Sequence, residues 1–501
     1  MQSAIRNPQS ARTPKSEARL GGLGSVSPLA ALVLLLLLAG CTVGPNYQRP
    51  PVMATPTGFR RAATDTNAPA GTNSLADLAW WQVFSDPQLA GYIHEALTNS
   101  WDIQIAAARV LQAEATLQVT RSQLFPTVAA GGDWQTVRAS EHGPTAIPPG
   151  VNPQKELGSV GVGAAYEVDL WGRLRRANEA ARARLLATID AQQTVRQTLI
   201  AGVASSYLTL LELDYQLQIA ERTYAARTNS LVLTTAREEG GVASMQDVHQ
   251  ARVLVSTAAA AIAQTHQFIE QQENALSLLL GRNPGTVQRG EGFARQALRP
   301  SVPAGLPSDL LERRPDLRTA EQQLVAANAD IGQAKAAFYP KLTLTGMYGF
   351  QSVALSDLFT SASRTWQFGP ALTMPLFTGG ALKGNLKLAQ AQWTEAVARY
   401  QQTVQIAFRE VSDALIAYQR TQEFRARQEE NTQARRAAAE LANVRYEGGV
   451  TSYLEVLYNE QELFSAEFSL AQAQLNERLS VVQLYRALGG GWQNDNIMAQ
   501  K

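Results

Sequence analysis

The chain of 501 residues is 45% hydrophobic and 17% charged, and its formal net charge is +1. This balance argues against an electrostatic nucleic-acid binder, which would normally carry a basic patch. The one cysteine, Cys41, excludes an intramolecular disulfide.

Residues 1–40 are predicted to be a bacterial lipoprotein signal peptide. A basic leader precedes a short apolar run, Leu29 to Leu38, and small residues then lead to Cys41. The pattern resembles a lipobox, which implies that Cys41 becomes the new N-terminus and carries N-acyl (palmitate) and S-diacylglycerol lipid, with no other cofactor. Thr42, where an inner-membrane lipoprotein would often have Asp, favours the outer membrane. The alternative is a free buried thiol behind an ordinary signal peptide.

Residues 41–79 form the predicted acylated linker, which is rich in Pro, Thr and Ala. The first folded repeat is predicted over 80–282. It contains a helix from about Asp102 to Leu124, which must end before Pro126 because a proline forces its predecessor out of the helical region.

Two strands, 127–138 and 157–170, are predicted to form a β-hairpin over 127–170. In the second strand, apolar residues from Val160 to Leu170 alternate with small or polar residues. A membrane β-barrel strand of about 9 to 11 residues shows this alternation. A soluble sheet packed on a core would alternate too.

Residues 173–239 contain no proline and one glycine, and their apolar residues recur every three or four positions. They predict one amphipathic helix about 100 Å long. Gly240-Gly241 reverses the chain, and a shorter helix is predicted to return to Gly281. No segment after Cys41 approaches the length of uninterrupted apolar sequence that a transmembrane helix needs.

The chain then repeats this plan. Arg237–Val248 recurs as Arg445–Val456, so a second repeat is predicted over 308–492, after an inter-repeat strap at 283–307. Its predicted elements, and the tail that follows them, are a helix from about Asp316 to Phe338, a β-hairpin over 342–376, a helix to Glu447, a turn at Gly448-Gly449, a helix ending near Leu488 and the tail 493–501.

The unpaired edges of these elements predict an assembly. Four membrane-type strands cannot close a barrel, and each unpaired backbone group in lipid costs several kcal/mol. Natural barrels start near eight strands, so a dimer or a trimer would close the sheet and a monomer would not. Long helices with narrow apolar stripes bury those stripes against one another, which predicts a helical tube.

The sequence offers no catalytic constellation. It lacks a zinc-protease motif, a nucleophile elbow, a phosphate loop and a Cys cluster, and its histidines are scattered at His94, His142, His249 and His266. We therefore expect neither enzymatic activity nor a metal site.

Several motifs together resemble one family. They are the lipobox with Cys41-Thr-Val-Gly-Pro-Asn-Tyr47, Trp80-Trp81 with Phe84-Ser-Asp-Pro87, Leu306 to Leu317, the doubled Gly-Gly turn, and Leu484 to Trp492. The chain resembles the outer membrane factors, the TolC-like efflux channels of Gram-negative bacteria, and within them the NodT-like lipoprotein branch.

The resemblance implies a mixed α/β membrane protein. Its fold would be a homotrimer with a twelve-stranded β-barrel in the outer membrane, continuous with a long α-helical barrel in the periplasm. Its function would be a passive conduit that exports small molecules for an inner-membrane pump, expected to be proton-driven, through a periplasmic adaptor.

The resemblance also implies candidate site residues. The tips that meet the adaptor correspond to Arg237, Gly240, Gly241, Val242, Ser244 and Asp247 in the first repeat and to Arg445, Gly448, Gly449, Val450 and Ser452 in the second. The tip glycines would also supply left-handed backbone at the reversal.

The periplasmic gate of the family corresponds to Leu454, Glu455 and Tyr458. Tyr458 departs from the Asp often found there, so we expect closure by bulk and hydrogen bonding. Asp247 and Tyr446 match latch positions of some relatives, but Thr451 replaces the family's arginine, and that salt bridge is expected to be missing.

Two other functions compete with small-molecule efflux. One is an outer-membrane channel for type I protein secretion. The other is a lipid-tethered periplasmic coiled-coil scaffold, which would need no β-barrel. The resemblance to the lipoprotein branch and the Leu-Gly-Gly-Gly-Trp ending favour efflux.

Overall fold

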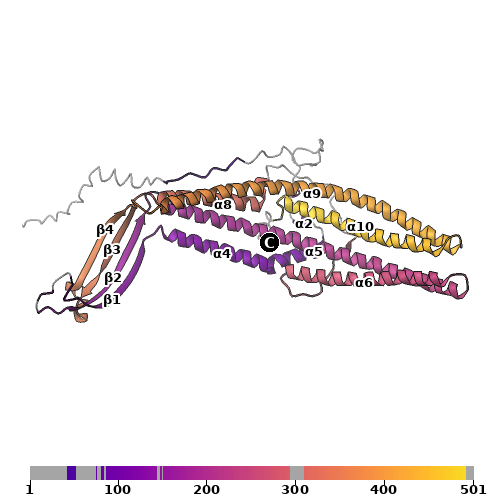
Figure 1. The fold of residues 1–501 in the computed structure, drawn as a ribbon, viewed down its shortest axis with the longest axis horizontal. Helices are drawn as coiled ribbons and strands as arrows, with labels where there is room; N and C mark the ends of the chain where they lie inside the picture. The colour runs from indigo at the N-terminus through magenta and orange to yellow at the C-terminus, as the bar shows by residue number, and fades with distance from the viewer. Residues whose placement is uncertain are drawn as a thin grey trace, which may run out of the picture.

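The computed structural model describes residues 42–51, 75, 80–83, 86–143, 147–148, 150–293 and 310–491. The predicted signal peptide, Cys41, most of the linker and of the strap, and the tail 493–501 therefore lie outside the described residues. The described part is elongated, with a sheet at one end and helices along the rest (Figure 1). None of its helices is both long enough and apolar enough to cross a membrane.

Four antiparallel strands form one sheet in the order β1-β2-β3-β4. Their bounds are Thr127–Arg138 for β1, Gln154–Val168 for β2, Lys341–Ser352 for β3 and Arg364–Thr373 for β4. The hairpins of the two repeats join at β2 and β3, where Val162 lies opposite Tyr348. Strands β1 and β4 are left at the two edges. Two short 3-10 turns, Leu355–Asp357 and Ser361–Ser363, connect β3 to β4.

Two predicted strands were wrong in their bounds. β2 begins three residues before Leu157 and ends at Val168, and β4 ends at Thr373 instead of residue 376. The chain leaves β2 in a tight turn, in which the backbone N–H of Leu170 donates to the carbonyl of Val168. After β4, Pro375 has no N–H to continue the ladder.

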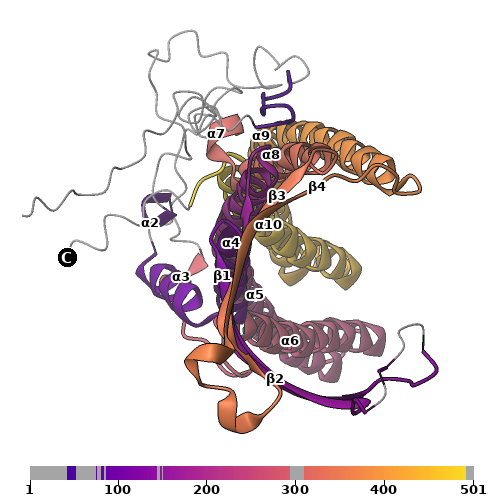
Figure 2. The same cartoon turned by 90° about the vertical axis from the view of Figure 1, so that its left-hand side faces the viewer.

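The helices run as two long rods flanked by shorter ones. The long helices α5 and α9, Arg173–Glu239 and Ala381–Glu447, have 67 residues each. The shorter helices are α4 (Trp101–Ser122) and α6 (Met245–Leu279) along α5, and α8 (Pro315–Ala336) and α10 (Tyr453–Ala487) along α9. α8 and α10 also pack on α5, which joins the two repeats. From the sheet end the helices lie along an open arc, with α6 near one end and α9 near the other (Figure 2).

The short helices meet end to end near the middle of the rods. Arg314, which is 7% exposed, donates through Nη1 to the carbonyl of Ala487 at the end of α10 (3.1 Å). Its Nη2 pairs with Asp316 in the first turn of α8 and with Glu410 on α9, both at 2.7 Å. One guanidinium thus ties both short helices to the long one. In the first repeat, Gly281 packs so tightly on the carbonyl of Asn99 that no Cβ would fit.

The main hydrophobic core surrounds this joint. It includes Tyr207 and Leu211 of α5, Val411 of α9 and Leu484 of α10, all at most 2% exposed. The small helices α2 (Trp80–Val83), α3 (Pro87–Asn99) and α7 (Leu310–Arg313) cover it.

Residues 42–51 lie along the outside of the seam between α5 and α8. The N–H of Val43 donates to the carbonyl of Trp171 (3.0 Å), and Asn328 of α8 donates to the carbonyl of Pro45 (3.0 Å). Thr42 contacts Gly172, at the junction of β2 and α5. The residue next to Cys41 is therefore fixed where the strands end and the helices begin.

Candidate functional site

The two hairpin tips are built alike. In the first, the N–H of Val242 donates to the carbonyl of Arg237 (2.9 Å) and that of Gly241 to Glu238 (2.8 Å); the second repeats these bonds from Val450 and Gly449. This is a Schellman cap, which satisfies the last carbonyls of the long helix. Val242 and Val450 project from the tips at 78% and 72% exposure.

One glycine of each pair accounts for the reversal. Gly241 and Gly449 have φ of 74° and 71°, a left-handed conformation in which a side chain is strained. Gly240 and Gly448 have φ of −76° and −75°, so our expectation of left-handed backbone at these two positions was wrong. They continue the helix, and the cap geometry needs only the next residue to turn left-handed.

The acidic residues that follow the two tips, Asp247 and Glu455, make different hydrogen bonds. Asp247 accepts from the N–H of Ser244 (3.0 Å) and receives its hydroxyl (2.9 Å), which closes a capping box at the start of α6. Glu455 instead accepts from Arg445 across the second turn (3.2 Å) and from the Thr451 hydroxyl. The hydroxyl of Ser452 makes no capping hydrogen bond.

Two of the three predicted gate residues, Leu454 and Tyr458, have mostly exposed side chains. Leu454 and Tyr458 are 58% and 57% exposed, whereas Tyr453 and Val456 on the other side of α10 are 2% and 1% exposed. The carboxylate of Glu455 is already paired with Arg445. An apolar and a phenolic side chain therefore face away from the rods beside a partly neutralised carboxylate.

The first tip is attached to the second. Arg237, at the end of α5, donates to the carbonyl of Glu447 (3.2 Å), and its guanidinium carbon lies 4.9 Å from the centre of the Tyr446 ring. Tyr446 packs in turn on Tyr453. Arg237 thus contacts the second hairpin within the same chain.

Before the tip turn, polar side chains of α5 also contact α10. The hydroxyls of Ser230 and Tyr453 lie 3.4 Å apart. Glu467 of α10 accepts from Arg222 of α5 and from Arg436 of α9, each at 2.7 Å. The inner helix of the second hairpin is therefore fixed to both long helices.

Comparison with known proteins identifies this architecture. The family model of the outer membrane efflux protein matches residues 92–282 and 306–490, which is more than half of the chain. The chain belongs to the outer membrane efflux protein family.

Relatives and solved structures agree with this assignment. The solvent efflux pump outer membrane protein SrpC of Pseudomonas putida is 39% identical over 462 residues, covering 91% of this chain and 97% of SrpC. The cation efflux system protein CusC of Escherichia coli is 33% identical over 468 residues, covering 93% and 99%. The solved outer-membrane channel OprN superposes with a TM-score of 0.82 at 32% identity, over 90% of this chain and 100% of that one.

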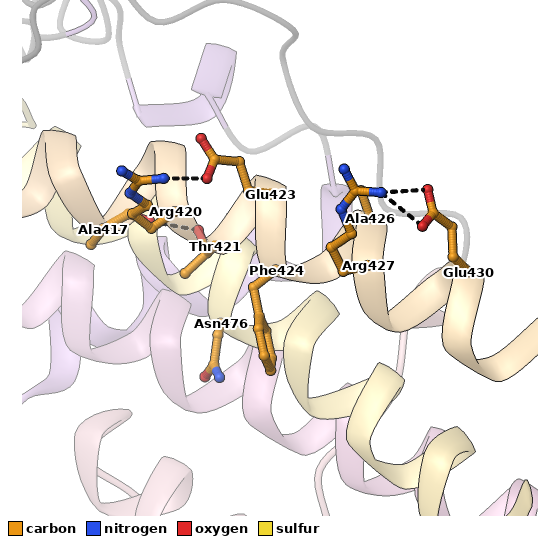
Figure 3. A pocket seen from close by; sticks show the side chains of 9 residues that line it. All are labelled: Ala417, Arg420, Thr421, Glu423, Phe424, Ala426, Arg427, Glu430 and Asn476. Atoms are coloured by element: carbon orange, nitrogen blue, oxygen red, sulfur yellow. Dashed lines mark hydrogen bonds and ion pairs between the residues drawn. The ribbon is translucent and has the colours of Figure 1, made fainter.

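The efflux protein also has an open cavity of about 830 Å³ along α9. Residues of α9 line most of it, and Asn476 of α10 completes it. Figure 3 shows Phe424 and Asn476 pointing toward one space, with the ion pairs Arg420–Glu423 and Arg427–Glu430 on the α9 side. Phe424 is 52% exposed, so an aromatic ring is left uncovered at this edge of the arc.

Sequence reasoning missed the buried contacts that join α5 to α6 and α10 in this efflux protein. Arg227 is among its largest fully buried side chains, at 1% exposure. The signal was available, because the buried stripe of α5 continues through Ile219, Ala220, Arg227 and Thr234 at helical spacing. A charge in an apolar stripe marks a buried polar contact.

No group of His, Cys, Asp and Glu that could hold a metal occurs among the described residues.

Proposed function

We propose that this protein is the outer-membrane channel of a tripartite efflux system, a passive conduit without catalytic activity. The observation that carries the proposal is the open arc itself. Two rods about 100 Å long continue into a sheet whose edge strands β1 and β4 have no further partner among the described strands, and Leu454 and Tyr458 are exposed near the far end. Three such arcs would enclose one continuous passage.

The edges of the arc support a homotrimer. β1 and β4 have no partner beyond β2 and β3 among the described strands. Large apolar side chains are exposed on the edge helices α4, α6 and α9, namely Ile105, Leu111, Val119, Val253, Phe268, Leu388, Phe424, Leu441 and Val444. An eight-stranded barrel would be filled by its own side chains, whereas twelve strands leave a lumen. A twelve-stranded barrel from three chains therefore fits a conduit better than a dimer does.

One face of the sheet suits contact with lipid. Val162, Tyr348 and Trp366 lie side by side across β2, β3 and β4, and each is about half exposed or more. On the other face Glu167 lies opposite Thr343. Apolar outside and polar inside is the pattern of an outer-membrane barrel. An acyl anchor on Cys41 would meet the membrane at the end of the sheet, since Thr42 contacts Gly172, where the chain passes from β2 into α5.

The exposed tips point to the partners of the channel. The exposed valines Val242 and Val450 and the neighbouring tip residues would meet a periplasmic adaptor, which links the channel to a proton-driven inner-membrane pump. The two relatives are named for solvents and for cations. One architecture therefore serves different cargoes, which is expected if the pump selects the substrate. We propose small toxic molecules as the cargo class.

The gate can be tested in a planar bilayer. Tyr458→Ala and Leu454→Ala should each at least double the single-channel conductance, because each shortens the same side chain in all three chains around the one constriction. The chain supplies a matched control, since the counterpart of Tyr458 in the first repeat is Gln250. Gln250→Ala should leave the conductance unchanged.

Light scattering on the same preparation separates the alternatives. Trimers whose conductance does not respond to either gate substitution would place the constriction elsewhere. A non-conducting, elongated monomer would instead favour the tethered scaffold.

A further inference from the structure

Arg227 of α5 is a buried cation held by neutral groups of two other helices. Its Nη1 donates to the carbonyl of Leu254 on α6 (3.1 Å). Its Nη2 donates to the carbonyl of Glu460 (3.4 Å) and to Oε1 of Gln461 (3.3 Å), both on α10. The Phe464 ring lies 5.0 Å from the guanidinium carbon. Among the described residues no carboxylate is in contact with the guanidinium, although the charge of Glu460 acts on it from farther away, and its Nε has no hydrogen-bond partner.

These contacts favour one placement of the helices. A guanidinium is planar and forms charge-assisted bonds in fixed directions, so its acceptors must keep their positions relative to one another. If α10 moved away from α5, the cation would stay buried with fewer acceptors, which is strongly unfavourable. Burial already lowers the pKa of Arg227.

The acceptors on α10 lie close to the gate. Glu460 follows Tyr458 by two residues and Leu454 by six, which is about 3 Å and 9 Å along the helix axis. Val456, on the buried side of α10, is 1% exposed, whereas Leu454 and Tyr458 are mostly exposed. A contact that fixes the buried side of α10 therefore also fixes where the gate residues stand.

The duplicated chain shows that this contact is particular to the first repeat. The counterpart of Arg227 is Arg435, which makes a half-exposed ion pair with Glu462 in its own hairpin (3.1 Å). The counterpart of Glu462 is Leu254, which offers only its carbonyl. The second hairpin thus packs with an ordinary ion pair at this position. Arg227 instead joins its own hairpin to α10 of the other one.

We propose that Arg227 is a positioning residue for the periplasmic gate: its guanidinium holds α10 against α5 and α6, and so keeps Leu454 and Tyr458 at the constriction. The gate belongs to the proposed channel function, and this inference rests on that function. Removing the guanidinium should release α10 and enlarge the passage while the gate side chains stay intact.

The test is single-channel conductance of the full-length trimer in a planar bilayer. Arg227→Met keeps most of the buried volume and removes the charge and the hydrogen bonds; conductance should rise at least twofold. Arg227→Lys keeps the charge without the planar fork and should give an intermediate rise. Arg435→Met is the matched control and should leave conductance unchanged, because that ion pair lies within the second hairpin.

The outcomes separate this inference from the channel function. A conductance of Arg227→Met equal to wild type, in trimers whose Tyr458→Ala variant does conduct more, would overturn the inference and leave the gate in place. If Arg227→Met does not assemble, Gln461→Met decides, since it removes one acceptor and keeps the arginine. A smaller rise supports the inference, and no change overturns it. Absence of conductance in every variant and in wild type would overturn the channel function itself.

Discussion

At the scale of single residues, Glu212 is an acid placed where no cation compensates it among the described residues. It is 1% exposed in the middle of α5, and its one hydrogen-bond donor is the amide of Gln216. Burial raises the pKa of Glu212 to about 7 from the usual 4.5. In the folded state the carboxyl therefore stays protonated over a range in which the unfolded chain has released that proton.

The consequence is a loss of stability as the pH rises. Between about pH 4.5 and 7 the folded state binds more protons, so the free energy of unfolding falls through this range, by up to roughly 3 kcal/mol per chain. Glu212→Gln should flatten that fall, as measured by thermal unfolding from pH 5 to 8. Glu221→Gln, at an exposed position of the same helix, should not. Parallel curves for wild type and Glu212→Gln would refute this assignment.

The two glycines of the first tip should respond differently to substitution by alanine. Gly241→Ala forces a side chain into left-handed backbone and should weaken the tip by about 1 to 2 kcal/mol. Gly240→Ala keeps helical backbone, with its Cβ no closer than 3.4 Å to the carbonyl of Ala236. Hydrogen exchange of the tip amides should therefore accelerate several-fold in the first variant and not in the second. Equal exchange in both would contradict the cap described here.

At the scale of elements, the segment 42–51 is held by a contact between two glycines. Gly44 has φ of 108° and lies directly on Gly332 of α8. A Cβ on Gly332 would lie 2.9 Å from the carbonyl of Val43 and 3.0 Å from the Arg176 side chain. The segment can pack on α8 because that helix presents no side chain at this point.

Gly332→Ala should therefore detach this segment without harming the helix. Alanine favours the α8 helix by about 1 kcal/mol, so a loss of packing would not reflect helix loss. Chymotrypsin should cleave after Tyr47, which is followed by Gln48, several-fold faster than in wild type, as followed by mass spectrometry. Gly91→Ala on α3, where a Cβ meets open space, is the control. Equal cleavage rates in the two variants would show that the contact does not hold the segment.

At the scale of the whole molecule, the arc leaves apolar surface at its edges. Phe424→Glu places a charge beside the cavity on α9, where association of copies would bury it at a high cost. Light scattering in detergent should then find monomers. Val242→Glu adds the same charge at the tip, outside the proposed contact between copies, and should leave the trimer intact. Trimers in both variants would exclude this edge of α9 from the interface.

The helices were largely predictable from the sequence. A proline-free stretch with apolar residues every three or four positions predicted α5 with the bounds observed, and the repeated Gly-Gly turn located both reversals. These properties are local, because helical hydrogen bonds join residues four apart. Strand ends were less predictable, since β2 and β4 stop where their partners and Pro375 allow.

The sequence by itself determined the two-repeat plan, the helix lengths, the turns and the family resemblance, because each depends on neighbouring residues or on a comparison of the chain with itself. Only the tertiary structure decided which side chains meet across the seam. Arg227 reaches Glu460 and Arg222 reaches Glu467, pairs more than 200 residues apart. Their meeting depends on how α10 lies against α5, and no local pattern in the sequence encodes that placement.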